Sequence, residues 1–189
     1  MNLSQKEIEQ FYKLWYTLVW RINKKHKVIP FFPKPIYENG LMVSQEKFME
    51  VRDKMWENPQ WIDEFLAEYN NGEFTEKERE IIQSWREHFI KDRFIIVKHL
   101  KNYSVFMRAS ENQVILYGAM GISDSFHTIC RGEAPLFVST VLIPFGDKII
   151  YDTFLVMNNI HFGTSLRKGI LNDYRKAKAD RGIITSITT

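Results

Sequence analysis

The first half of the chain has hydrophobic residues at helical spacing. They recur three or four positions apart in four segments, as on one face of an amphipathic helix. Each segment follows a residue that can cap a helix; the four residues are Ser4, Ser44, Asn58 and Thr75. Ser4 and Thr75 each precede a glutamate by three positions, which is the spacing of a capping box. The pattern predicts four helices in residues 1–92.

Prolines and glycines predict where these helices are interrupted. Residues 28–40 contain three prolines, which forbid a continuous helix and indicate a connector between the first two helices. Pro59 suits the first position of the third helix, directly after its expected cap Asn58. The pair Asn71-Gly72 is expected to end that helix.

The pattern changes after residue 92. Short segments rich in β-branched and aromatic residues, separated by polar breaks, are typical of strands joined by hairpins. The polar segment 121–134 predicts a turn or a short helix. The pattern predicts five strands, at residues 93–100, 103–109, 113–120, 135–143 and 148–157.

Residues 141–152, with the sequence VLIPFGDKIIYD, predict the central hairpin of this half. Two apolar runs flank a Pro-Phe-Gly-Asp break. A strand with one solvated face would alternate between apolar and polar residues, whereas these runs are apolar almost throughout. We therefore expect protein to cover both faces of the hairpin. Asp152 ends the second run, and we interpret it as a rim residue or as the partner of a nearby Arg or Lys; a catalytic role is the alternative.

The last segment predicts a basic helix. Gly163 precedes Thr164 and Ser165, and either of these two can cap a helix that runs to about Ala179. Gly182 follows as a stop signal. Between residues 164 and 182, six basic and two acidic residues give a local net charge of +4. The sequence IITSI after this helix is compatible with a short terminal strand.

These elements predict an α+β protein. An N-terminal bundle of about four helices, residues 1–92, is expected to pack on a small five-stranded antiparallel sheet or barrel with a C-terminal helix, residues 93–189. The two parts form either two domains or one compact unit. In size and number of strands, the second part is comparable to SH3-like and OB-like modules.

Composition narrows the class of protein. Of the 189 residues, 44% are hydrophobic and 26% are charged, which is typical of a folded globular chain. The single cysteine, Cys130, excludes an internal disulfide and a cysteine-based zinc site, and it fits a reducing compartment. The start of the chain has no signal-peptide pattern, and no apolar run is long enough to cross a bilayer. We expect a cytoplasmic protein without a membrane partner.

The net charge of +3 is distributed unevenly. Residues 1–92 contain 14 Lys and Arg against 16 Asp and Glu, a net charge of −2. Residues 93–189 contain 12 against 7, a net charge of +5. The basic second half favours an anionic partner, either nucleic acid or another protein.

The start of the terminal helix is the best candidate for an anion site. A helix start exposes unpaired backbone N–H groups and carries partial positive charge. Basic side chains on the same helix reinforce that charge; the alternative is an ordinary capped surface helix. The candidate anion-binding or nucleic-acid-binding residues are Thr164, Ser165, Arg167, Lys168, Arg175 and Lys176.

An enzyme that uses the loop 121–134 together with Asp152 is a less favoured hypothesis. The loop contains Asp124, His127 and Cys130. In a helical turn the last two would be neighbours, and the imidazole could promote a thiolate. A buried structural cysteine is the alternative. We assign no catalytic residue.

Other residue types carry weaker signals. The five histidines are scattered without the spacing of metal ligands, so neither a metal site nor a cofactor is expected. Tyr103, Phe106 and Tyr117 could stack on bases, or they pack in the core. We interpret the basic run at residues 21–27 as a match to the dipole at the end of the first helix.

From about residue 93 to residue 184 the chain resembles a group of bacterial proteins. The resemblance lies in the VLIPFGDKIIYD hairpin, the Phe-Gly step at residues 162–163 and the basic terminal helix. The group has an LPF-x-x-KIIYDG hairpin. Here Thr153 stands where that pattern has Gly, and Gly163 is followed by Thr-Ser instead of further glycines. The resemblance implies a bacterial protein and no particular activity.

The sequence therefore favours a non-catalytic binding or accessory module for nucleic acid or another anionic partner. A protein-interaction or oligomerisation domain is the alternative, ahead of an enzyme.

Overall fold

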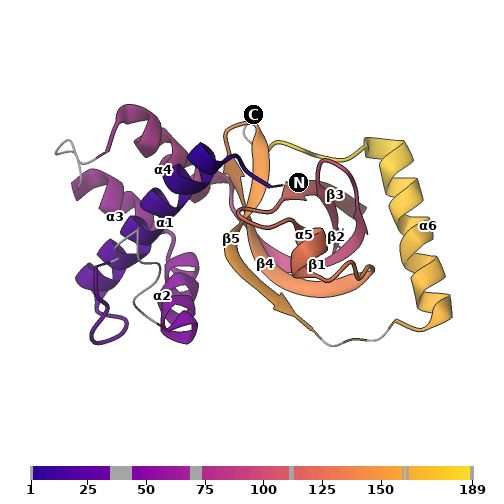
Figure 1. The fold of residues 1–189 in the computed structure, drawn as a ribbon, viewed down its shortest axis with the longest axis horizontal. Coiled ribbons are helices and arrows are strands. Elements are labelled where there is room, and N and C mark those ends of the chain that lie inside the picture. Colours follow the sequence, from indigo (N-terminus) through magenta and orange to yellow (C-terminus); the bar gives the residue numbers. More distant parts are fainter. Residues whose placement is uncertain are drawn as a thin grey trace. The chain divides into compact units, whose positions relative to one another are not determined.

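The structure is a computed structural model that describes residues 2–34, 44–68, 74–110, 113–158, 160 and 162–187. The chain divides into two compact units, Ser4–Glu87 and His88–Thr189 together with Met1–Leu3. Each unit is described by itself (Figure 1). The expected helix stop at Asn71-Gly72 and the side chain of His161 lie outside the described residues.

The unit Ser4–Glu87 is helical. It contains α1 (Gln5–His26), α2 (Gln45–Glu57), α3 (Gln60–Glu68) and most of α4 (Glu76–His88). Both predicted capping boxes are present: the backbone N–H groups of Ser4 and Thr75 each donate to the glutamate three residues later, at 2.9 Å. The four predicted helices are confirmed.

The start of α3 differs from the prediction. Asn58 is the C-cap of α2, and its side-chain amide donates to the carbonyl of Lys54 at 2.9 Å. The side chain is therefore turned back toward α2 and does not cap α3. The carbonyl of Asn58 instead accepts from the N–H of Trp61 at 2.9 Å.

Aromatic rings form the core of the helical unit. Trp15 of α1 is fully buried. Its ring centroid lies 5.8 Å from that of Trp85 in α4, 6.0 Å from that of Trp56 in α2 and 6.4 Å from that of Phe48, also in α2. Contacts between large rings contribute more than the buried area alone, so this cluster joins three helices of the unit.

The second unit contains a closed five-stranded barrel. Its elements are β1 (Ile90–His99), β2 (Ser104–Ser110), β3 (Gln113–Met120), α5 (Phe126–Ile129), β4 (Leu136–Phe145), β5 (Lys148–Met157) and α6 (Thr164–Arg181). The strands pair in the closed order β1-β2-β3-β5-β4. The predicted α+β class, with N-terminal helices, five strands and a C-terminal helix, is confirmed. Whether the two units are separate domains stays a prediction.

One pairing departs from the predicted antiparallel sheet. β3 and β5 run parallel, through Ala119 opposite Ile149 and Met120 opposite Ile150. The other four pairings are antiparallel. The parallel contact closes the ring, so the sheet is mixed.

α5 contributes side chains to the interior of the barrel. Phe126 and Cys130 are buried in one cluster with inward residues of the strands, among them Phe94, Phe106 and Ile149. The ring centroid of Phe126 lies 4.8 Å from that of Phe106. The short helix predicted as one option for residues 121–134 therefore completes the barrel core.

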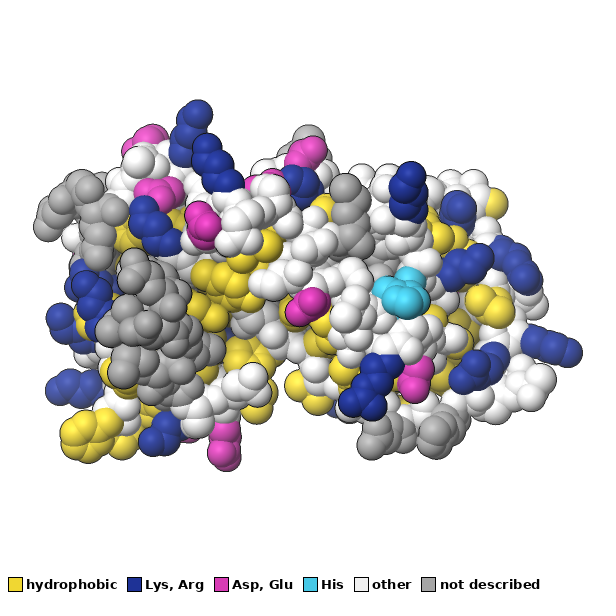
Figure 2. All heavy atoms as spheres, viewed as in Figure 1, with side chains coloured by type: hydrophobic (Ala, Val, Ile, Leu, Met, Phe, Trp, Pro, Cys, Tyr) yellow, Lys and Arg dark blue, Asp and Glu magenta, His cyan; other side chains and the backbone are white. Residues whose placement is uncertain are grey.

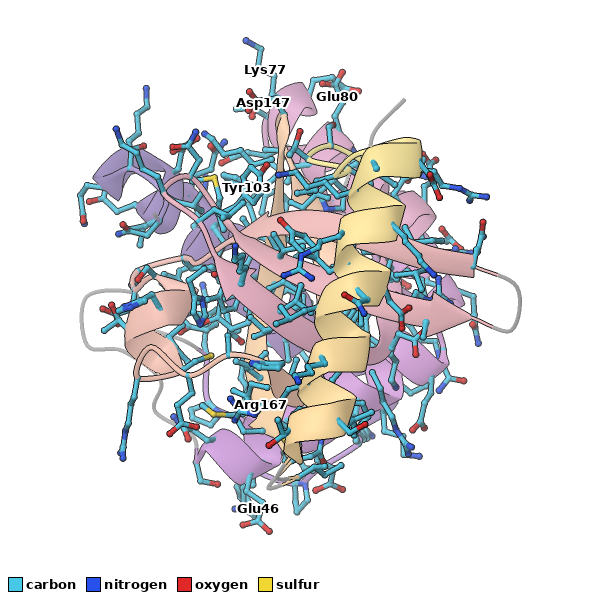
Figure 3. The ribbon with its side chains drawn as sticks, turned by 90° about the vertical axis from the view of Figure 1, so that its right-hand side faces the viewer. Glu46, Lys77, Glu80, Tyr103, Asp147 and Arg167 are labelled. Carbon is cyan, nitrogen blue, oxygen red and sulfur yellow. The ribbon has the colours of Figure 1, made fainter. Side chains whose placement is uncertain are left out.

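α6 covers part of the outer surface of the barrel (Figure 3). Ile170, Tyr174 and Ala177 lie on one face of the helix and are buried in a second cluster. That cluster also contains the strand residues Val97, Val105, Met107 and Leu116. At the far end of α6 the Arg181 guanidinium donates to the Gln113 side chain. The helix is thus fixed to β1, β2 and β3.

The hairpin of β4 and β5 is buried as predicted. Val141 and Ile143 point to one face of β4, and Leu142 points to the other. All three side chains are fully buried, and so are Ile149 and Ile150 of β5. Protein therefore covers both faces.

The end of this hairpin differs from the prediction. Asp152 is fully buried, so its interpretation as a rim residue is wrong. Thr153 has a positive φ of 79° and lies within the irregularity in the pairing of the two strands, between Tyr151 and Leu155. A left-handed backbone favours glycine, so threonine is an unusual residue at this position.

The chain after α6 forms only an isolated bridge. Ile184 donates to the carbonyl of Leu116 at 2.9 Å and accepts from Gly118 at 2.8 Å. The residues IITSI thus align with β3 at one position and add no full strand. Among the described residues, no helix has the length and apolar character needed to cross a membrane.

Candidate anion-binding site

The start of α6 is built differently from the prediction. Gly163 is the N-cap, and its carbonyl accepts from the N–H of Arg167 at 3.0 Å. Neither Thr164 nor Ser165 caps the helix, since both lie in its first turn, where they are exposed. Glycine has no side chain that could accept a hydrogen bond. The first backbone N–H groups of α6 therefore receive no side-chain cap from Gly163.

Three predicted cations lie together on the solvent face of α6. Residues three, four and seven apart share one face of a helix, so Lys168, Asn172 and Arg175 form a row opposite the buried face, with Lys176 beside it. These four residues are all exposed, and we call them the outer row. The acidic residues Asp173 and Asp180 lie three and four positions from Lys176, on the side of the row that Lys176 borders. Figure 2 shows Lys and Arg side chains along α6, on the right.

Two of the predicted arginines have partners within the unit. The Nε–H of Arg167 donates to the carbonyl of Phe162 at 3.1 Å, at the first turn of α6 (Figure 3). Arg175 donates to the side-chain carbonyl of Asn172 at 3.0 Å, within the outer row. Lys168 and Lys176 make no hydrogen bond or ion pair with any residue that the structure describes. The structure therefore groups Lys168, Arg175 and Lys176 and separates Arg167 from them.

The loop 121–134 lacks the geometry of a nucleophilic site. Cys130 is 3% exposed, and burial raises the pKa of its thiol to about 11. The thiol is therefore protonated near neutral pH, contrary to the hypothesis of a promoted thiolate. Within the described part of the chain no hydrogen bond joins it to His127, whose ring lies against that of His99 at 5.4 Å. Nor do the described residues include a cluster of three His, Cys, Asp or Glu that could hold a metal ion.

The strand aromatics are core residues. Phe106 is fully buried and Tyr117 is 5% exposed, both in the barrel interior. Tyr103 packs against the cluster beneath α6, and its ring lies so close to Gly118 that a Cβ there would be 2.8 Å from it. The hypothesis that these rings stack on bases is wrong for Phe106 and Tyr117.

His99 ties two strands to the loop after α5. Its Nε2 lies 3.0 Å from the carbonyl of Glu133, and its Nδ1 lies 2.8 Å from the hydroxyl of Ser104. A carbonyl only accepts, so Nε2 carries the proton and Nδ1 accepts from Ser104 in the neutral ring. Burial lowers the pKa of His99 below its ordinary value of 6.5.

We expect the stability of the protein to fall with pH below about 6.5 in part because of His99. The unfolded chain takes up the proton first, so the contribution of His99 is fully present above pH 6.5 and is lost as the pH falls toward the lowered pKa. Urea unfolding between pH 5 and pH 7.5 should therefore show a steeper loss of stability for the wild type than for His99→Gln. His26, whose pKa burial also lowers, is present in both proteins. Parallel curves for the two proteins would contradict the assignment.

The helical unit also contains a feature that the sequence pattern did not predict. The C-terminal end of α1 and the connector after it line a shallow, open hollow of about 610 Å³. Its lining includes three lysines, Lys24, Lys27 and Lys34, and the aromatic residues Trp20 and Phe31. The prediction treated the basic run at the end of this helix as a dipole match only.

Comparison with known proteins gives no relative. No protein-family model matches the chain, and neither a curated protein nor a solved structure shows significant similarity to it. The resemblance to a group of bacterial proteins stays a prediction.

Proposed function

We propose that the chain is a non-catalytic binding module that contacts the backbone phosphates of nucleic acid through the outer row of α6. The observation that carries the proposal is the exposure of Lys168, Arg175 and Lys176 on the side of α6 opposite its buried face. Contacts between lysine or arginine and phosphate release counterions and supply affinity for any sequence.

The rigid placement of α6 supports this function. Buried Ile170, Tyr174 and Ala177 fix the opposite face of the helix to the barrel. Because the backbone of α6 is fixed, only the side chains of these cations lose freedom when they meet a row of phosphates. Because phosphate contacts carry no direct sequence information, the expected binding is largely independent of sequence.

The test is a charge reversal of the outer row. In Lys168→Glu/Arg175→Glu/Lys176→Glu, three phosphate contacts are lost, so the slope of log affinity against log salt should fall by about 3 for duplex DNA. From 50 to 200 mM salt, these contacts alone account for an affinity change of about 40-fold in the wild type. Fluorescence anisotropy with a labelled duplex and a labelled single strand measures both quantities.

A matched control changes net charge by the same amount elsewhere. Lys6, Lys47 and Lys77 are exposed and lie in the first turns of α1, α2 and α4, where glutamate suits the helix dipole. Their triple replacement by glutamate should leave the salt slope unchanged. Equal effects of the two triple variants, or wild-type binding that does not depend on salt, would refute the proposal.

Exposed apolar side chains favour a second candidate, a protein-interaction surface. Val156, Met157, Ile160 and Leu166 are between 43% and 54% exposed, and they follow one another from the end of β5 to the first turn of α6. Light scattering of the same samples without nucleic acid tests it, since a mass well above 22.5 kDa would indicate self-association through such a surface.

A further inference from the structure

The hollow at the end of α1 concentrates positive charge in the otherwise acidic half of the chain. Residues 20–34 contain five Lys and Arg and no Asp or Glu, whereas residues 1–92 carry a net charge of −2. Figure 2 shows Lys and Arg side chains at the lower left, around the end of α1. The volume of about 610 Å³ is in the range of pockets that bind small molecules.

Three of these cations surround a single indole ring. The guanidinium carbon of Arg21 lies 4.8 Å from the centroid of Trp20, and the amino groups of Lys24 and Lys34 lie 5.3 and 5.7 Å from it. A match to the helix dipole explains Lys24, which is in the last turn of α1. The helix dipole does not explain Lys34, because this residue lies beyond the end of the helix. Its amino group nevertheless contacts the same indole ring.

The lysines of the hollow differ from their neighbour Lys25 in their pairing. Lys25 forms ion pairs with Glu64 and Glu68, at 2.6 and 2.5 Å. Lys24, Lys27 and Lys34 pair with no carboxylate of any described residue. Their charge is therefore available to an anionic ligand, which would relieve the repulsion between them.

Hydrogen bonds hold the connector in place around the hollow. The side chain of Asn23, which is 5% exposed, donates to the carbonyl of Ile29 at 3.1 Å and accepts from its N–H at 2.9 Å. Phe32 packs its ring 5.9 Å from that of Phe48 in α2. The walls of the hollow are thus anchored to the helical core before any ligand binds.

No packing contact with a residue that the structure describes explains the position of Phe31. Its side chain is 94% exposed, and its backbone has a positive φ of 54°, which a bulky residue rarely adopts. An aromatic ring presented in this way beside unpaired lysines offers a stacking surface next to an anion site.

We propose that this hollow binds a nucleotide, with its phosphates on Lys24, Lys27 and Lys34 and its base on Phe31. A simple anion would leave the exposed ring unused, and an apolar ligand would leave the lysines unpaired. A free nucleotide and an unpaired nucleotide within a strand share this chemistry. The proposal does not depend on α6, because every lining residue belongs to the helical unit.

Titration calorimetry with ATP and with inorganic triphosphate tests the proposal, because the two probes share the phosphates and only one has a base. The wild type should bind ATP about five- to a hundred-fold more tightly than inorganic triphosphate. Phe31→Ala should remove that difference and leave inorganic triphosphate binding unchanged; its exposed position makes a folding defect unexpected. Lys24→Gln/Lys34→Gln should weaken both probes by about tenfold or more.

The control Lys6→Gln/Lys47→Gln removes the same charge from exposed sites outside the hollow and should bind as the wild type does. A single-stranded hexanucleotide separates the two sources: tighter binding than ATP, lost in Phe31→Ala, supports a strand, and tighter ATP binding supports a free nucleotide. The outer-row triple variant should bind ATP normally, which separates this proposal from the function proposed for α6. Absence of ATP binding, equal binding of the two probes by the wild type, or an unchanged preference in Phe31→Ala would overturn the proposal.

Discussion

Phe126→Ala is expected to destabilise the barrel unit by about 3–5 kcal/mol. Phe126 is 1% exposed, and its ring centroid lies 4.8 Å from that of Phe106 and 4.9 Å from that of Tyr151. Removal of the ring leaves a cavity between α5 and the strands, and a four-residue helix has few other contacts with which to close it. The segment should therefore open more often and expose Cys130.

The single cysteine makes this opening measurable without any further substitution. Because burial holds the pKa of Cys130 at about 11, the closed form reacts slowly with a thiol reagent. A loss of about 3 kcal/mol should speed labelling by about a hundredfold or more. Phe126→Leu keeps an apolar side chain of similar size and should stay within about tenfold of the wild type. A Phe126→Ala protein that is labelled at the wild-type rate would show that α5 does not depend on this ring.

The sequence predicted the secondary structure of this protein better than the way in which its strands close into a barrel. Capping boxes and apolar spacing are local signals, and they located the helices and the strands to within a few residues. The closure depends on the parallel contact of Ala119 and Met120 with Ile149 and Ile150, thirty residues further along the chain. Both segments are apolar and would be buried in a parallel or in an antiparallel pair. The spacing of apolar residues therefore does not predict the direction of pairing.

The structure locates the predicted cations on α6 and contradicts the predicted cap, while anion binding itself stays a prediction. Periodicity placed Lys168 and Arg175 on one helix, and the structure puts them on its solvent face. Arg167 is one residue from Lys168 and therefore points about 100° away from it, toward the carbonyl of Phe162. Gly163 took the cap position because glycine is also accepted there.

The hollow at Trp20 was missed because its parts lie in two kinds of segment. Lys24 belongs to a helix end, where a cation is expected. Lys34 belongs to a proline-rich connector, where the spacing of charged residues does not predict which of them lie together. Only the return of the connector toward α1 brings both amino groups to one ring. One available signal was the run of residues 20–34 with five cations and no acid.

Trp15→Ala is expected to destabilise the helical unit by about 3–5 kcal/mol. Trp15 is fully buried, and its ring contacts rings of α2 and α4 as well as Phe11 of its own helix. No smaller side chain can reach all of these partners, so the cavity would lie at the junction of three helices. Urea unfolding followed by the helical circular dichroism signal measures the loss.

Trp15→Phe is the informative comparison, because the indole N–H of Trp15 is buried and has no hydrogen-bond partner among the residues that the structure describes. A buried donor without a partner costs about 1–3 kcal/mol, and phenylalanine removes that donor while it keeps an aromatic ring among the others. The smaller ring loses packing, but the removed desolvation cost offsets part of that loss. We therefore expect Trp15→Phe to lose less than half of the stability that Trp15→Ala loses. Similar losses in the two variants would contradict the cost assigned to the buried indole N–H.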